Sequence, residues 1–163
     1  MRNPKFDTLF ISHYHRVYRQ VYRIVKSEQE AEDLVQEVFL RLYNHLDEIK
    51  LEHVHSWLHR VAINLSLNAI RNRKRLHNWQ QKAMDIKRDG GDVARMNIAD
   101  DSLVRHCLAL LPERQAQLLL LHAAGFSYEE LALATGIQKT SVSRLLMRAR
   151  QAFRKLYNKE ALR

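Results

Sequence analysis

Residues 127–148, SYEELALATGIQKTSVSRLLMR, contain the pattern that predicts the structure of the C-terminal part of this chain. Ser127 and Glu130 have the spacing of a capping box, in which each side chain satisfies the other residue's backbone N–H at the start of a helix. Ala132 is small where two helices approach closely, and Gly136 adopts positive φ without strain where the chain must turn. A basic helix is predicted to follow. This spacing predicts a helix-turn-helix, whose second helix enters the major groove of DNA.

The outward side of that second helix is polar and basic. Lys, Arg, Gln and Ser side chains are suited to base edges and phosphates. The alternative is an ordinary helical hairpin with a solvated basic face, but the turn, the cap, the apolar pattern and the charge all favour DNA binding. The candidate DNA-binding residues are Gln138, Lys139, Thr140, Ser143, Arg144, Met147 and Arg148.

The composition of the whole chain predicts an all-α protein without a membrane span. It has 163 residues, 46% of them hydrophobic, with only four Gly and two Pro. Few turn residues argue against a sandwich or barrel. Apolar runs such as Leu118–Leu121 are far shorter than the roughly 20 residues that a membrane helix needs. No signal segment opens the chain, so we expect it in the cytoplasm. The single Cys107 excludes an internal disulfide framework.

The N-terminal part predicts three helices around one small core. Apolar residues recur at steps of three and four from Phe6 to Val25, again from Ala31 to Leu42, and again from Trp57 to Ile70. Ser27 and Glu30 form a second capping-box pair before the middle helix. Periodicity then fades around the Gly90-Gly91 pair. We therefore predict two small helical domains, a bundle over 1–77 and a helix-turn-helix domain over 101–163, joined by a flexible linker over 78–100 that can include helical pieces.

Charge is unevenly distributed along the chain. The net charge of +9 suggests a polyanionic partner. Residues 53–84 and 138–159 contain no acidic residue, whereas residues 27–40 contain five acidic residues and no basic one. Two basic blocks and one acidic block predict two nucleic-acid surfaces and one surface of another kind. On the third helix, one polar face can grip a nucleic-acid strand, and it consists of Arg60, Asn64, Asn68, Arg71 and Arg75.

Several of these segments resemble the sigma factors of bacterial RNA polymerase. Residues 31–40, AEDLVQEVFL, resemble the polymerase-binding helix, and residues 56–75 resemble the promoter-reading region that follows it. Leu111-Pro112-Glu113-Arg114, residues 126–132 and Arg148-Ala149-Arg150 resemble the C-terminal sigma domain. The order and spacing are those of the extracytoplasmic-function (ECF) group, which keeps only these two domains. The resemblance covers nearly the whole chain.

The resemblance implies a role for each surface. Asp33, Gln36, Glu37 and Leu40 would bind the clamp coiled coil of core RNA polymerase. The third helix, with the loop over 47–55, would read and open the minus-ten promoter element and capture a flipped base. The helix-turn-helix domain would read the minus-thirty-five element and dock on the polymerase flap, with the linker in the RNA exit path. The resemblance also implies control by an anti-sigma factor.

The recognition helix departs from the family pattern at one place. ECF factors usually have Thr-Val-Lys-Ser-Arg-Leu ahead of Arg-Ala-Arg, and this chain has residues 141–147, SVSRLLM. The apolar framework is kept, but the basic positions are shifted. We therefore expect the helix to enter the groove with base contacts that differ from those of relatives.

Two other classes of function remain as alternatives. A stand-alone helix-turn-helix regulator would bind DNA without polymerase, and it leaves the acidic block unexplained. A metal-dependent nucleic-acid enzyme would use histidines such as His55 and His59, which have i, i+4 spacing, and the nearby His53. A zinc site, however, requires a third protein ligand in a defined geometry. We expect these histidines to be polar surface residues and predict no metal, no cofactor and no catalytic residue. The protein is therefore predicted not to be an enzyme.

Overall fold

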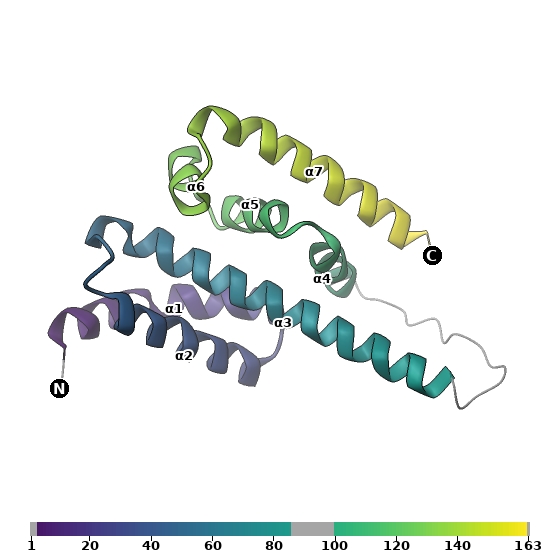
Figure 1. Cartoon of the computed structure of the whole chain (residues 1–163), viewed down its shortest axis with the longest axis horizontal. Helices are drawn as coiled ribbons and strands as arrows, with labels where there is room; N and C mark the ends of the chain where they lie inside the picture. Colours follow the sequence, from purple (N-terminus) through teal and green to yellow (C-terminus); the bar gives the residue numbers. More distant parts are fainter. Residues whose placement is uncertain (1–2, 86–99, 163) are drawn as a thin grey trace.

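A computed structural model describes residues 3–85 and 100–162, with side chains described for 3–80 and 101–162. Over these residues the chain contains helices and no strand, which confirms the predicted all-α class (Figure 1). The α-helices are α1 (Pro4–Val25), α2 (Glu28–His45), α3 (Val54–Asp85), α4 (Asp100–Leu110), α5 (Glu113–Ala123), α6 (Tyr128–Thr135) and α7 (Lys139–Ala161), and a 3-10 helix, Leu51–His53, precedes α3.

Helices α1, α2 and α3 form the N-terminal half. Asn3 begins α1, because its Oδ1 accepts from the backbone N–H of Phe6 at 3.3 Å. The helix ends at Val25, and the φ of 56° at its C-cap residue, Lys26, lies in the left-handed region. The apolar stripes of the helices meet in a shared core, as predicted. Its buried members include Val17, Val21, Val25, Val35, Val38, Phe39, Leu42, Leu58, Ile63 and Leu67.

The predicted capping box at the start of α2 is half right. The Oγ of Ser27 accepts from the backbone N–H of Glu30 at 3.4 Å. The Glu30 carboxylate, however, pairs with the guanidinium of Arg73 on α3. Arg73 also donates to the carbonyl of Val25 at 3.4 Å and thereby ties the junction of α1 and α2 to α3. A charge-assisted bond to arginine is stronger than a bond to a neutral N–H, which accounts for the difference.

Helices α4 to α7 form the C-terminal half and contain the predicted helix-turn-helix. The Ser127 Oγ accepts from the N–H of Glu130 at 3.3 Å, and Glu130 Oε2 accepts from the N–H of Ser127 at 2.7 Å. These bonds complete the capping box of α6 and lower the pKa of the Glu130 carboxyl. Gly136 then turns the chain at a φ of 67°. Leu131 of α6 and Val142 of α7 are buried on either side of this turn.

Replacing Gly136 tests the turn directly. A Cβ added at Gly136 meets no atom within 4 Å, so the cost of Gly136→Ala is backbone strain at positive φ. We expect Gly136→Ala to lower the free energy of unfolding by about 1 kcal/mol. Gly136→Asn is the matched control, because asparagine tolerates this conformation better. Urea unfolding followed by circular dichroism measures both, and equal stability of Gly136→Ala and the parent would contradict the turn geometry.

The long helix α3 lies between the two halves. Figure 1 shows α1 and α2 on one side of it and α4, α5 and α6 on the other, with α7 on their outer side. The buried core continues through α3 into the C-terminal half. An ion pair at 3.0 Å between Lys26 Nζ and Asp101 Oδ2 also joins α1 to α4. The halves are therefore packed together.

Three further features complete the description of the fold. Helix α3 runs on to Asp85, inside the range 78–100 predicted as linker, and residues 86–99 lie outside the described residues. Cys107 is fully buried in α4. Within the described residues, no helix combines the length and apolar character needed to cross a membrane.

Candidate polymerase and nucleic-acid surfaces

The four residues predicted to bind polymerase lie along one side of α2. Their spacing places them together on the helix, and the opposite side packs Val35, Val38 and Phe39 into the core. We call this set, Asp33, Gln36, Glu37 and Leu40, the acidic face. Asp33, Gln36 and Leu40 are exposed, and Leu40 has 56% of its surface open to solvent. An apolar side chain beside exposed acids is an arrangement suited to binding another protein.

Glu37 is the least exposed member of the acidic face. Its Oε1 accepts from Arg41 Nε, one helical turn on, at 2.7 Å. The pair is solvent-exposed and of the i,i+4 type, which contributes only about 0.3–0.5 kcal/mol. A partner with its own basic residue can therefore replace Arg41 at little cost.

The predicted DNA-reading residues of α7 share one exposed surface. All seven are exposed, including Met147 at 51%, while Val142, Leu146 and Ala149 hold the helix against the C-terminal core. We call the seven residues the recognition face. Lys139 forms an ion pair with Glu129 of α6, which lowers the pKa of the Glu129 carboxyl. The helix-turn-helix thus leaves a polar and basic surface open for a nucleic acid.

The polar face of α3 is divided between solvent and the C-terminal half. Asn68 and Arg75 are exposed. Arg60 donates to the carbonyl of Ala134 at 3.3 Å, and Asn64 Oδ1 accepts from the amide of Gln117 on α5. Arg60 and Asn64 are thus engaged by the C-terminal half in this packed arrangement, and nucleic-acid binding by the five residues stays a prediction.

Arg71 is engaged in the same way at the end of α4. It donates to the carbonyls of Leu111 at 3.0 Å and Ala109 at 3.4 Å, and its Nη1 lies 4.0 Å from a carboxylate oxygen of Glu113. The last carbonyls of a helix lack intrahelical partners and carry partial negative charge. Arg71 satisfies these groups at the end of α4, as Arg60 does in the last turn of α6. This explains why the arginines turn toward the C-terminal half.

A cavity lies at the loop between α2 and α3. Its volume is about 510 Å³, and it includes part of the segment over 47–55 that was predicted to capture a flipped base. Trp57 supplies an aromatic wall, and Lys50 a positive charge. Aromatic walls stack on bases, and positive charges attract phosphates. The residues that line it are His45, Glu48, Ile49, Lys50, His53 and Trp57.

The predicted exposure of the histidines is wrong for one of them, His59. His59 was expected at the surface, but only 5% of it is exposed, because this residue of α3 lies between Gln20 of α1 and Phe126. His53 and His55 are half-buried. In the part of the chain that the structure describes, no group of three His, Cys, Asp or Glu residues is close enough together to hold a metal ion.

Comparison with known families matches both halves of the chain. Residues 9–76 match the family described as Sigma-70 region 2, and residues 102–153 match Sigma-70, region 4. The order along the chain is the one that the sequence resemblance predicted. Together the two matches span about three-quarters of the chain.

Individual relatives agree with these matches. The ECF RNA polymerase sigma factor SigE of Mycolicibacterium smegmatis is 32% identical over 93% of this chain and 61% of its own length. The chain thus spans less than two-thirds of that relative. RNA polymerase sigma-H factor of Pseudomonas aeruginosa is 29% identical over 92% of this chain and 84% of its own, and Bacillus subtilis SigM is 24% identical over 94% and 95%.

Solved structures show the same fold. The sigma factor RpoE of Bartonella quintana, solved with the anti-sigma factor NepR, has a TM-score of 0.56 and 19% identity, covering 96% of this chain and 98% of that one. CnrH, solved with the cytosolic domain of CnrY, has a TM-score of 0.59 and 20% identity, covering 94% and 88%. At these identities the likeness supports the fold alone.

Proposed function

Because this chain belongs to the ECF group of the sigma-70 family of RNA polymerase sigma factors, we propose that it binds core RNA polymerase and directs it to a class of promoters. One observation carries the proposal. The two family regions occur in order, and each presents an exposed surface of the expected chemistry, acidic on α2 and basic on α7. Sigma factors are initiation factors and not enzymes, so polymerisation chemistry belongs to the partner.

The acidic face is our candidate for the clamp coiled coil of the polymerase. Its acids would meet basic residues of the partner, and Leu40 would add apolar contact at the same place. We assign docking on the polymerase flap to the C-terminal half. The protein then acts in the cytoplasm, where the polymerase transcribes.

The recognition face is our candidate reader of the minus-thirty-five element. Arg144 is exposed in the second turn of α7, close to the N-terminal end that enters the groove in helix-turn-helix proteins. An arginine at this place can donate two hydrogen bonds to guanine.

Removing Arg144 tests this assignment. We expect Arg144→Ala to weaken binding of the holoenzyme to its promoter by about 1–3 kcal/mol and to relax sequence preference at one position. Arg154→Ala removes an exposed arginine farther along the same helix and is the control. Fluorescence anisotropy on promoter duplexes with single base changes measures both. An unchanged preference in Arg144→Ala would remove this residue from base reading.

The minus-ten element is assigned to α3 and to the cavity before it. The cavity at the α2–α3 loop supports the capture of a flipped base, because its lining offers an aromatic wall and a positive charge. Asn64 and Arg71, however, are bound to the C-terminal half in the packed arrangement. Reading of the minus-ten element by these residues therefore requires the halves to separate.

We also propose that an anti-sigma factor controls this protein. Two solved structures of the same fold contain a second protein, NepR in one and the cytosolic domain of CnrY in the other, and NepR is an anti-sigma factor. An inhibitor of this kind would act by covering the acidic face or by holding the halves together. Pull-down with a candidate inhibitor, with and without core polymerase, distinguishes these modes.

A further inference from the structure

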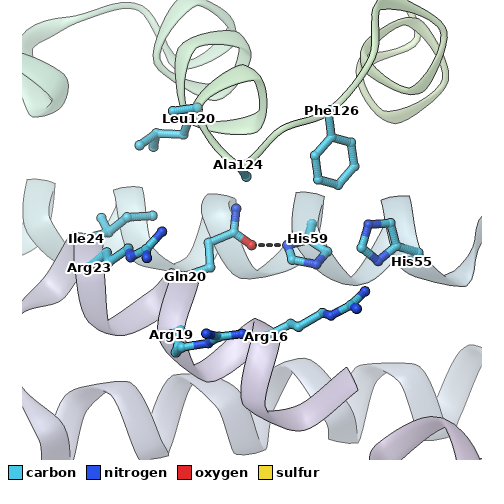
Figure 2. A pocket seen from close by; sticks show the side chains of 11 residues that line it. Arg16, Arg19, Gln20, Arg23, Ile24, His55, His59, Leu120, Ala124 and Phe126 are labelled. Atoms are coloured by element: carbon cyan, nitrogen blue, oxygen red, sulfur yellow. Dashed lines mark hydrogen bonds between the residues drawn. The ribbon is translucent and has the colours of Figure 1, made fainter. Parts of the chain in front are cut away.

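A second cavity, of about 400 Å³, lies between the two halves. Helix α1 contributes three arginines to its wall, α3 contributes two histidines, and the end of α5 with Phe126 lies opposite them (Figure 2). We call it the interface pocket. Its principal polar lining residues are Arg16, Arg19, Gln20, Arg23, His55 and His59.

The charge in the interface pocket is strongly one-sided. Arg16, Arg19 and Arg23 follow one another at steps of three and four, so their guanidinium groups lie along one face of α1. Among the described residues, none that lines the pocket has a carboxylate. Glu130, which acts electrostatically on His55, is already bound to Ser127 in the capping box of α6. Like charges gathered at a partly enclosed site repel one another unless an anion neutralises them.

The interface pocket also contains buried polar atoms without partners. His59 is 5% exposed, and its Nδ1 is hydrogen-bonded to Gln20 Oε1. Within the described parts of the chain, the Nε2 of His59 and the Nε2 of Gln20 have no hydrogen-bond partner. Figure 2 shows the Gln20 amide nitrogen pointing toward Ala124, across the pocket. Buried polar groups nearly always find partners, so these two atoms are available to a hydrogen bond from a bound water or a polar ligand.

The environment of the interface pocket favours the neutral form of its histidines. Burial, followed by the nearby His55, His13 and Arg16, lowers the pKa of His59 to about 4. Burial likewise lowers the pKa of His55, although Glu130 opposes this. A bound anion would favour protonation of either ring, which would add positive charge and a further N–H donor to the site.

We propose that the interface pocket binds a small phosphorylated anion. Guanidinium groups match phosphate oxygens in geometry and charge, and three arginines of α1 line this pocket. The pocket volume falls within the range of about 300–1,000 Å³ that is typical of small-molecule sites. The end of α5 and Phe126 close the side opposite α1, which suits a compact ligand better than a continuous nucleic-acid strand.

The position of the pocket gives such a ligand a regulatory effect. Its walls come from both halves, so the ligand stabilises the packed arrangement in which Asn64 and Arg71 are covered. It would thereby oppose promoter engagement. This consequence rests on the proposed sigma function, whereas the binding of the anion does not.

Titration calorimetry of the full chain with inorganic pyrophosphate tests the binding. We expect saturable binding at one site, weakened about tenfold or more in the double variant Arg16→Gln with Arg19→Gln. Arg154→Gln, which removes an exposed charge on α7, is the matched control and should bind as the parent does. Circular dichroism checks that each variant is folded. The absence of binding to the parent, or an equal loss in Arg154→Gln, would overturn the proposal.

Two further titrations identify the source of the phosphoryl group. Tighter, Arg16- and Arg19-dependent binding of ADP than of pyrophosphate would assign the pocket to a nucleotide, and weaker binding of ADP would assign it to a free phosphoanion. A single-stranded oligonucleotide that binds through these arginines while pyrophosphate does not would contradict a small-ligand site. All three titrations omit polymerase, so their failure is independent of the sigma function.

Discussion

Glu37→Arg is expected to abolish binding of this protein to core RNA polymerase while leaving the helical fold intact. Glu37 lies in the middle of the acidic face and forms an exposed ion pair with Arg41. Replacing it with arginine places two like charges one turn apart and turns attraction to a basic partner into repulsion. Loss of a close interfacial charge pair costs about 2–5 kcal/mol, which is about 30-fold or more in affinity.

Pull-down and fluorescence-labelled titration of core polymerase measure this effect. Glu48→Arg is the control. Glu48 lies just beyond the end of α2, is also exposed, and is paired with a neighbour, His45. It should retain binding to core polymerase. Full retention of binding by Glu37→Arg would exclude the clamp assignment of the acidic face.

Holding the two halves together is expected to reduce transcription strongly. Gln20 and Ala124 line the interface pocket from opposite halves and belong to neither the acidic face nor the recognition face. Gln20→Cys with Ala124→Cys, joined by a reversible bis-thiosulfonate reagent, would keep Asn64 and Arg71 covered. We expect promoter-dependent transcription to fall about tenfold or more on cross-linking. Reduction of the cross-link should restore it.

The cross-linking experiment contains its own controls. The native Cys107 is fully buried, so we expect the reagent to react with the introduced cysteines and not with Cys107. Gln151→Cys with Lys155→Cys places a cross-link within α7 alone and should leave transcription unchanged. Full transcription by a completely cross-linked Gln20–Ala124 variant would show that the packed arrangement is already competent.

The features that the sequence predicted correctly are local ones. Ser127, Glu130 and Gly136 act within a few turns of chain, and the capping box and the positive φ are present where the spacing placed them. The apolar stripes of α1 and α2 likewise each identify a single buried face. Exposure of the acidic and recognition faces followed, because residues opposite a buried stripe face solvent.

The features that the sequence did not predict depend on contacts between distant segments. Helix α3 buries residues on more than one side, among them Leu58 and Leu67, so it serves two halves of the protein at once. Arg60 and Arg71 then meet the free carbonyls at helix ends more than 35 residues away. The spacing of residues along α3 does not predict where those helix ends lie in the folded protein.

Reconstituted transcription tests the central proposal most directly. Purified protein is added to core polymerase from a related bacterium, with genomic promoter fragments as template. We predict specific transcripts that depend on the added protein and are absent with Glu37→Arg. The absence of both transcripts and core binding, with DNA binding retained by the protein alone, would contradict a sigma factor and identify a stand-alone helix-turn-helix regulator.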